Sequence, residues 1–253
     1  LERELENRQY LFASLLGRGD LFFEGRGELD PLEVIEHMAA RYQVDRDRIY
    51  LVGHSHGAGG VQHVASRNPD LFAGAVSAQI MDGPLNLENM MHVPYMQIAG
   101  TGDPIDNGNG AMSRYNALSA LGYDATWYQY NLKTHENSSI SDAITQIFDM
   151  YDRHVRPENP ATVVYTRSGG DFDEALGLLH DGAYWVSDMV AANPAQDMAV
   201  RAESFGIAHA PLDPPSATVV SNQAVDTNAS NGRPPNDVSG RSQAFLSQTT
   251  CLL

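Results

Sequence analysis

The sequence predicts an α/β fold, in which a mostly parallel sheet carries helices on both of its faces. Short apolar runs rich in β-branched residues alternate with amphipathic segments through the first 156 residues. Strands that alternate with helices in this way form parallel sheets. A Pro-rich break at residues 156–160 ends the alternation, and the composition after the break is different. The chain is therefore expected to have two parts.

Five segments of the first part are expected to be strands, namely residues 10–16, 48–52, 73–78, 93–99 and 125–130. Each segment is a short apolar run bounded by turn-forming residues. Helices are expected from Asp30, over residues 57–66 and over residues 139–151. Asp30 is expected to be the N-cap, because Pro31 follows it and Glu33 stands three positions after it.

The second part, residues 157–253, is expected to be a small β-rich accessory region that ends in a flexible tail. Strands without clear helices between them are expected at residues 161–165, 183–186 and 198–202. From about residue 211 the chain is rich in Pro, Ser, Asn, Gly and Thr, and residues 221–237 have too few apolar side chains to pack alone. The predicted organisation is a main domain over residues 1–156 followed by this region.

The charge balance excludes several classes of partner. The 253 residues include 32 acidic and 16 basic side chains, which gives a formal net charge of −16 at pH 7. We expect such a chain to repel nucleic acid and anionic membrane surfaces. It has no apolar run of about 18 residues, so no membrane-spanning helix is expected.

The two ends of the sequence say little about the compartment. Cys251 is the only cysteine, so no internal disulfide is expected. The chain begins at Leu1 with a charged segment that is not a secretory signal. Either a leader has been removed or the chain is a fragment of a longer protein, and the second interpretation is favoured. The compartment and the oligomeric state stay open.

The strongest functional signal is the pentapeptide GHSHG at residues 53–57, which has the pattern G-x-S-x-G. The bare pattern can arise by chance. Here it follows an apolar run and precedes a segment of small residues, which is the strand–turn–helix context that exposes a serine at the edge of a sheet. A Cβ at either glycine would clash in so tight a turn. Ser55 is therefore the predicted nucleophile.

The two histidines beside this serine are given different roles. The backbone N–H of His56 is predicted to be an oxyanion-hole donor, because it lies at the positive end of the following helix. His54 is predicted to pack beneath the turn. A metal site is not expected here, since no third ligand has a recognisable spacing, and no cofactor is implied.

A hydroxyl nucleophile needs a base, and the base needs an acid that orients it. Asp103 follows the expected strand 93–99 directly, in the segment GTGDP, so it is predicted to lie at the same sheet edge as Ser55. Asp106 is a nearby alternative, and Asp82 is a weaker one. An ordinary Asp-Pro turn is the structural alternative for Asp103 itself.

His135 is the predicted base. It lies between the last expected strand and the last expected helix of the first part, where a loop can reach over the sheet edge to Ser55. The order nucleophile, acid, histidine along the chain is the order found on sheets of this kind. The other histidines of the sequence lie in or beside expected helices and strands, or in the β-rich region.

Residues 45–60 resemble the nucleophile region of bacterial α/β-hydrolase esterases and of prolyl-oligopeptidase-like (S9-type) hydrolases. Residues 68–76 resemble the segment that follows that region in the family, and residues 102–105 resemble the acid turn. Asp106 stands where a small apolar residue is usual. The resemblance covers about residues 10–155.

This resemblance implies an α/β-hydrolase catalytic domain with a triad of Ser55, Asp103 and His135. In the family, earlier strands and a Gly-rich loop come before this region, and the loop gives a second oxyanion-hole donor. Neither is found in this sequence. The catalytic domain, residues 1–156, is therefore expected to be the C-terminal portion of such a domain.

The predicted function is hydrolysis of a carboxylic ester through an acyl-enzyme, on a small-molecule ester or a peptide substrate. The close rival is an S9-type peptidase that uses the same groups on a peptide bond. The rival from another class is a catalytically inactive, hydrolase-like binding module. The acyl and alcohol groups of the substrate stay open, because the residues that line a substrate site are scattered loop side chains.

Overall fold

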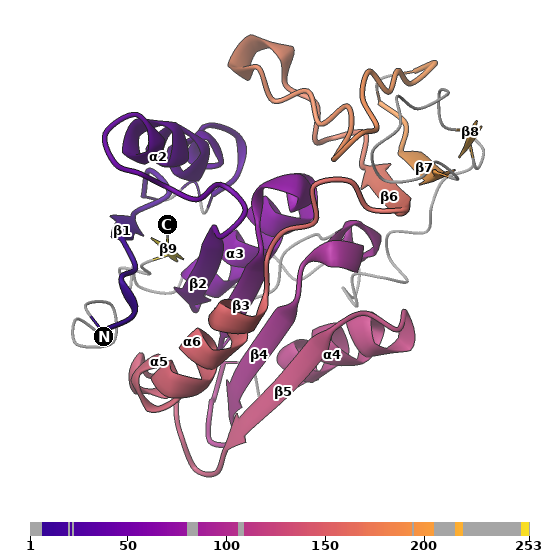
Figure 1. The fold of residues 1–253 in the computed structure, drawn as a ribbon. Coiled ribbons are helices and arrows are strands. Elements are labelled where there is room, and N and C mark those ends of the chain that lie inside the picture. Colours follow the sequence, from indigo (N-terminus) through magenta and orange to yellow (C-terminus); the bar gives the residue numbers. More distant parts are fainter. Residues whose placement is uncertain are drawn as a thin grey trace.

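A mostly parallel sheet forms the centre of the molecule in the computed structural model (Figure 1). The structure describes residues 7–19, 21, 23–79, 86–105, 109–193, 195–204, 216–219 and 249–252. The spatial order of the strands is β1-β9-β2-β3-β4-β5, and their bounds are Phe12–Leu15 (β1), Tyr50–His54 (β2), Gly74–Ala78 (β3), Tyr95–Gly100 (β4), Ala125–Tyr130 (β5) and Thr249–Leu252 (β9). Neighbours from β2 to β5 are parallel, so the predicted fold class is confirmed.

Strand β9 comes from the part of the chain for which the sequence predicts only a flexible tail. It lies between β1 and β2 and pairs antiparallel with both. The prediction is therefore wrong for Thr249–Leu252, because two strand-favouring threonines and an apolar pair can join a sheet whatever the composition before them. Residues 220–248, which include the segment 221–237, lie outside the described residues.

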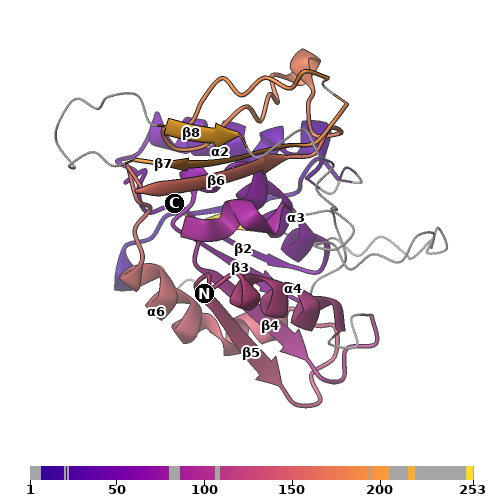
Figure 2. The ribbon, with the colours of Figure 1, turned by 90° about the vertical axis from the view of Figure 1, so that its right-hand side faces the viewer.

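Helices cover both faces of the sheet (Figures 1 and 2). Three helices pack on one face, namely α2 (Leu29–Ala39), α3 (His56–Arg67) and α4 (Asn109–Ala120). Two helices pack on the other face, namely α5 (Ser138–Asp142) and α6 (Ile144–Arg153). Short 3-10 helices are present at Gly25–Gly27 (η1), Pro69–Leu71 (η2), Leu87–His92 (η3) and Glu174–Leu176 (η4).

The structure corrects two of the helix predictions and adds one helix that the sequence does not predict. Glu28 is the N-cap of α2, and the predicted cap Asp30 lies in the first turn, where its charge faces the positive end of the helix. The single helix expected over residues 139–151 is two helices, because the backbone at Ala143 leaves the helical region. Helix α4 is not predicted, because its small and polar residues carry little helical periodicity.

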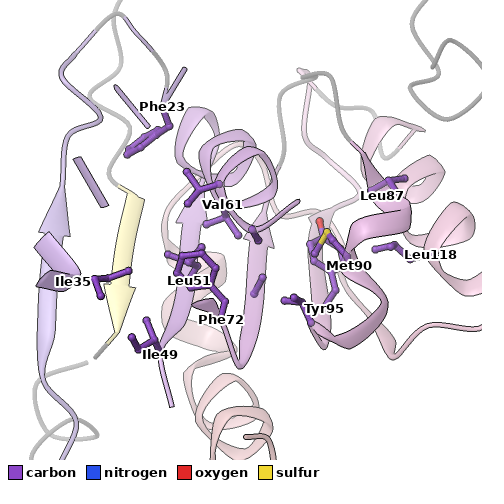
Figure 3. Packing of buried hydrophobic residues seen from close by; sticks show 14 of the residues in the cluster. Phe23, Ile35, Ile49, Leu51, Val61, Phe72, Leu87, Met90, Tyr95 and Leu118 are labelled. Carbon is purple, nitrogen blue, oxygen red and sulfur yellow. The ribbon is translucent and has the colours of Figure 1, made fainter. Parts of the chain in front are cut away.

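The alternation of side chains along the strands divides the core into two parts. Leu51 packs with Ile35 and Val61 on the face that carries α2 and α3, and Figure 3 shows this cluster. Its neighbour Tyr50 points to the opposite face, where its ring stacks on that of Tyr151 with 4.3 Å between centroids. The central strands are thus buried on both sides, which explains why their sequences are apolar runs and not alternating patterns.

A second, three-stranded antiparallel sheet follows the Pro-rich break. Its order is β6-β7-β8, with bounds Thr162–Arg167 (β6), Met198–Glu203 (β7) and Ser216–Val219 (β8). It lies beside α3 and η3, away from α6 (Figure 2). Two of the strands predicted here are present as β6 and β7. The strand expected at 183–186 is wrong, because that segment is a tight turn closed by an isolated bridge between Ala183 and Val186.

Buried polar contacts hold this second sheet against the first part. The side chain of Asn89 in η3 accepts from the backbone N–H of Thr166 at 2.6 Å and donates to its carbonyl at 2.8 Å. The same amide donates to the carbonyl of Ser66 in α3 at 2.7 Å. Within the described part of the chain, none of the helices has the length and apolar character needed to cross a bilayer.

Candidate active site

Ser55 lies at the sharp turn between β2 and α3. Its backbone is strained, with φ of 56° and ψ of −120°, a region that a residue with a Cβ rarely adopts. A Cβ added to Gly53 would come within 3.0 Å of the Gly57 carbonyl oxygen, so only glycine fits beneath the turn. The backbone N–H of Ser55 donates to Ala78 of β3 at 2.9 Å, which ties the turn to the sheet.

Asp103 lies in the turn that follows β4, at the same edge of the sheet. Its side chain is only 1% exposed. The carboxylate oxygen Oδ1 accepts from the backbone N–H of Ile105 at 2.8 Å. This bond leaves Oδ2 directed at the neighbouring loop.

His135 lies in the loop between β5 and α5, and it contacts both of the other side chains. Its Nδ1 is 2.8 Å from Oδ2 of Asp103, and its Nε2 is 2.7 Å from Oγ of Ser55. The structure thus brings together the three residues that the sequence predicts as nucleophile, acid and base, from three separate loops.

The chemistry of these groups fixes the direction of both hydrogen bonds. An ionised carboxylate can only accept, so Nδ1 of His135 carries the proton that is shared with Asp103. The neutral ring then has its lone pair on Nε2, where it accepts from the hydroxyl of Ser55. An imidazole held in this tautomer can take a proton from the serine.

Two further histidines surround this group. His56 is the first residue of α3, so its backbone N–H is at the positive end of the helix. Burial lowers the pKa of His56, and the nearby His135 lowers it further. His54 is buried beneath the turn and its ring lies 4.9 Å from that of His135. Burial also lowers the pKa of His54, against the opposing effect of the hydrogen bond that its Nε2 donates to Gln79.

Gln79 is a site residue that sequence reasoning does not find. It directly follows β3 and is fully buried, and its side chain contacts both His54 and the loop that carries His135. A glutamine has no motif of its own. The one signal in the sequence is its place at the end of a strand, at the edge where Ser55 and Asp103 also lie.

The alternative acids lie outside the described residues. This holds for both Asp82 and Asp106, so Asp103 is the one candidate acid whose position relative to His135 is described. Among the residues that the structure does describe, no group of three or more histidines, cysteines, aspartates or glutamates is arranged to hold a metal ion.

Comparisons with known proteins find similarity over the same part of the chain. Residues 26–149 match the prolyl oligopeptidase family, the S9 family of peptidases. Ser55, Asp103 and His135 all lie inside the matched segment. The match supports the resemblance to S9-type hydrolases over these residues, which are just under half of the chain. No curated protein matches the chain significantly.

Several solved structures are similar to part of the chain. They include a thermostable esterase (18% identity, TM-score 0.49), the acylaminoacyl peptidase of Pyrococcus horikoshii (16% identity, TM-score 0.41) and esterase PE8 (18% identity, TM-score 0.39). These similarities cover 55%, 52% and 47% of this chain, in the same order. The chain spans 39% of the length of the first protein, 28% of the second and 57% of the third.

Proposed function

We propose that the chain hydrolyses a carboxylic ester through an acyl-enzyme, because residues 26–149 match the prolyl oligopeptidase family and the central sheet is mostly parallel. Ser55 is the nucleophile, His135 the base and Asp103 the acid that orients the base. One observation carries the proposal, which is the unbroken pair of hydrogen bonds from Asp103 through His135 to Ser55, at 2.8 and 2.7 Å.

The reaction would follow from the direction of these bonds. Nε2 of His135 takes the proton of Ser55 as Oγ attacks the ester carbonyl, and the resulting imidazolium is stabilised by Asp103. The tetrahedral oxyanion faces the N-terminus of α3, where the backbone N–H of His56 donates to it. His135 then protonates the leaving alkoxide, and in the second half of the reaction it activates the water that releases the acid.

A peptide bond is the second candidate substrate, because the matched family is one of peptidases. We favour the ester because an alkoxide leaves more readily than an amine, so its departure depends less on protonation by the general acid. In either case residues 1–156 are the proposed catalytic domain and residues 157–253 an accessory region. The ratio of kcat/KM on short acyl esters to that on matched peptide amides decides between the two substrates.

Labelling with a fluorophosphonate tests the nucleophile directly. We expect one covalent adduct on Ser55, no adduct in Ser55→Ala, and a fall in ester kcat of about 10⁴-fold or more in that variant. Ser119→Ala is a matched control, since Ser119 is an exposed serine in α4, and it should keep both labelling and turnover. A folded wild-type chain that takes no label would favour the non-catalytic binding module.

A further inference from the structure

The side chain of Gln79 is buried between the nucleophile turn and the loop of His135. Gln79 has no exposed surface, and its backbone φ of 50° is in the left-handed region that residues other than glycine rarely adopt. Its N–H donates to the carbonyl of Ile98 at 2.9 Å, so the backbone is fixed in this conformation. Strained residues of this kind cluster at functional sites.

A single backbone carbonyl determines how the amide of Gln79 is oriented. The carbonyl of Thr134 can only accept a hydrogen bond, so the atom of Gln79 that contacts it is the donor Nε2. The acceptor Oε1 therefore faces His54, whose Nε2 lies 2.6 Å away. It follows that His54 donates from Nε2, which fixes the tautomer of the buried ring.

Both contacts of this amide act on His135. Thr134 immediately precedes His135 in the chain, so its carbonyl sets the backbone from which the imidazole projects. The ring of His54 packs against that of His135, with 4.9 Å between centroids and 52° between planes. The amide of Gln79 thus holds the backbone next to His135 through its bond to Thr134. Its bond to His54 holds the ring that packs against the imidazole of His135.

Two further contacts hold earlier residues of the loop. The carbonyl of Lys133 accepts from the N–H of Gly102 at 3.0 Å, and the N–H of Leu132 donates to Oγ1 of Thr101 at 2.8 Å. These bonds attach the loop to the turn that carries Asp103. Gln79 adds a contact one residue closer to the imidazole, and it comes from a different strand, β3.

We infer that Gln79 is a positioning residue for the proposed hydrolysis: by donating to Thr134 and accepting from His54, it holds the imidazole of His135 in line between Asp103 and Ser55. This inference rests on the proposed function, since positioning has a catalytic effect only if His135 is the base. His54 then acts as a neutral spacer and not as a second base, because its Nε2 proton is held by Gln79. A displacement of about 1 Å in such a site can reduce turnover by about 100-fold.

The test compares two glutamines that have the same burial. Gln79→Met keeps the length of the side chain and removes both hydrogen bonds. Gln97→Met makes the same change at a second fully buried glutamine, in β4. The hydrogen bonds of its side chain join it to core residues and not to the loop, namely Ser77, Ile98, Tyr95 and Gln62. We expect ester kcat to fall about 10- to 100-fold in Gln79→Met, with KM within about 3-fold of wild type. In Gln97→Met we expect kcat within about 3-fold of wild type at a similar loss of thermal stability.

The possible outcomes separate this inference from the proposed function. If the wild-type chain hydrolyses esters and Ser55→Ala does not, but the two methionine variants have the same kcat, the positioning role is wrong and the proposed function stands. If the wild-type chain is inactive and takes no fluorophosphonate, the proposed function fails and the inference fails with it. A Gln79→Glu variant keeps the acceptor for His54 and cannot donate to Thr134 when ionised, so we expect it to lose turnover as well.

A measurement on the wild-type protein keeps the inference testable even if the variants do not fold. The orientation of the Gln79 amide requires the proton of neutral His54 to be on Nε2. We expect two-bond ¹H–¹⁵N correlation spectra of the histidine rings near pH 7.5 to show His54 with a protonated Nε2 and an unprotonated Nδ1. A His54 signal with the proton on Nδ1 would overturn the proposed contact.

Discussion

Replacing Gly53 by alanine tests whether the strained turn places Ser55. The added Cβ would come within 3.0 Å of the Gly57 carbonyl oxygen, whereas ordinary contact begins at 3.4 Å. Because that oxygen belongs to backbone, the turn must shift. Overpacking of this kind costs about 1–3 kcal/mol. In a chain of this size each kcal/mol lowers Tm by about 2–4 °C, so a cost of about 2 kcal/mol predicts a fall of about 4–8 °C.

The same shift of the turn should also reduce ester kcat, even at temperatures where the variant is folded. Ser55 follows Gly53 by two residues, and a misplacement of about 1 Å predicts an ester kcat lower by about 100-fold at a temperature where the variant is fully folded. Gly170→Ala is the control, because nothing lies within 4 Å of the added Cβ there, and its unfolding free energy should stay within about 0.5 kcal/mol of wild type. If Gly53→Ala matched Gly170→Ala in both Tm and kcat, the reasoning would be refuted.

Two further predictions concern the contacts between the two parts of the chain. Asn89→Ala should lower the free energy of unfolding by about 3 kcal/mol in urea titrations, about 1 for each of its three buried bonds; a loss below about 1 kcal/mol would contradict this. Burial raises the pKa of Glu28, but the rings of His180 and His63, each 3.4 Å from its carboxylate, lower the pKa more, so the net direction is downward. The ionised carboxylate therefore stabilises the fold above its unfolded pKa of about 4.3, and this contribution is lost as the pH falls below that value. The difference in unfolding free energy between wild type and Glu28→Gln should shrink from about pH 5 to 3, and a difference independent of pH would contradict the assignment.

The sequence predicts the central part of the fold well, because the information there is local. All five strands of the first part are present, with bounds within two residues of those predicted. The strand pattern is clear because both faces of the central strands are buried. The motif, the strand ends and the order along the chain together predict Ser55, Asp103 and His135 as one set, and the structure brings their side chains into contact.

What the sequence does not predict depends on contacts between distant segments. Strand β9 is separated from both of its partners by more than 190 residues of chain. A local sequence pattern does not indicate a pairing between segments so far apart. Helix α4 has no strong apolar face of its own, so only its packing on the sheet makes it recognisable. Gln79 is a third case, because its partners His54 and Thr134 lie 25 and 55 positions away.

These observations explain why the identity of the site residues is easier to predict than their geometry. The identities follow from a short motif and from chain order. The geometry follows from backbone groups at the ends of three parallel strands, since Ala78 binds the turn of Ser55 and Gly102 binds the loop before His135. Parallel strands end at one edge of a sheet, so each loop needs only one or two such bonds to bring its side chain to the shared site. A change in any of these bonds should therefore lower the turnover of the proposed reaction, even though the three proposed catalytic residues are unchanged.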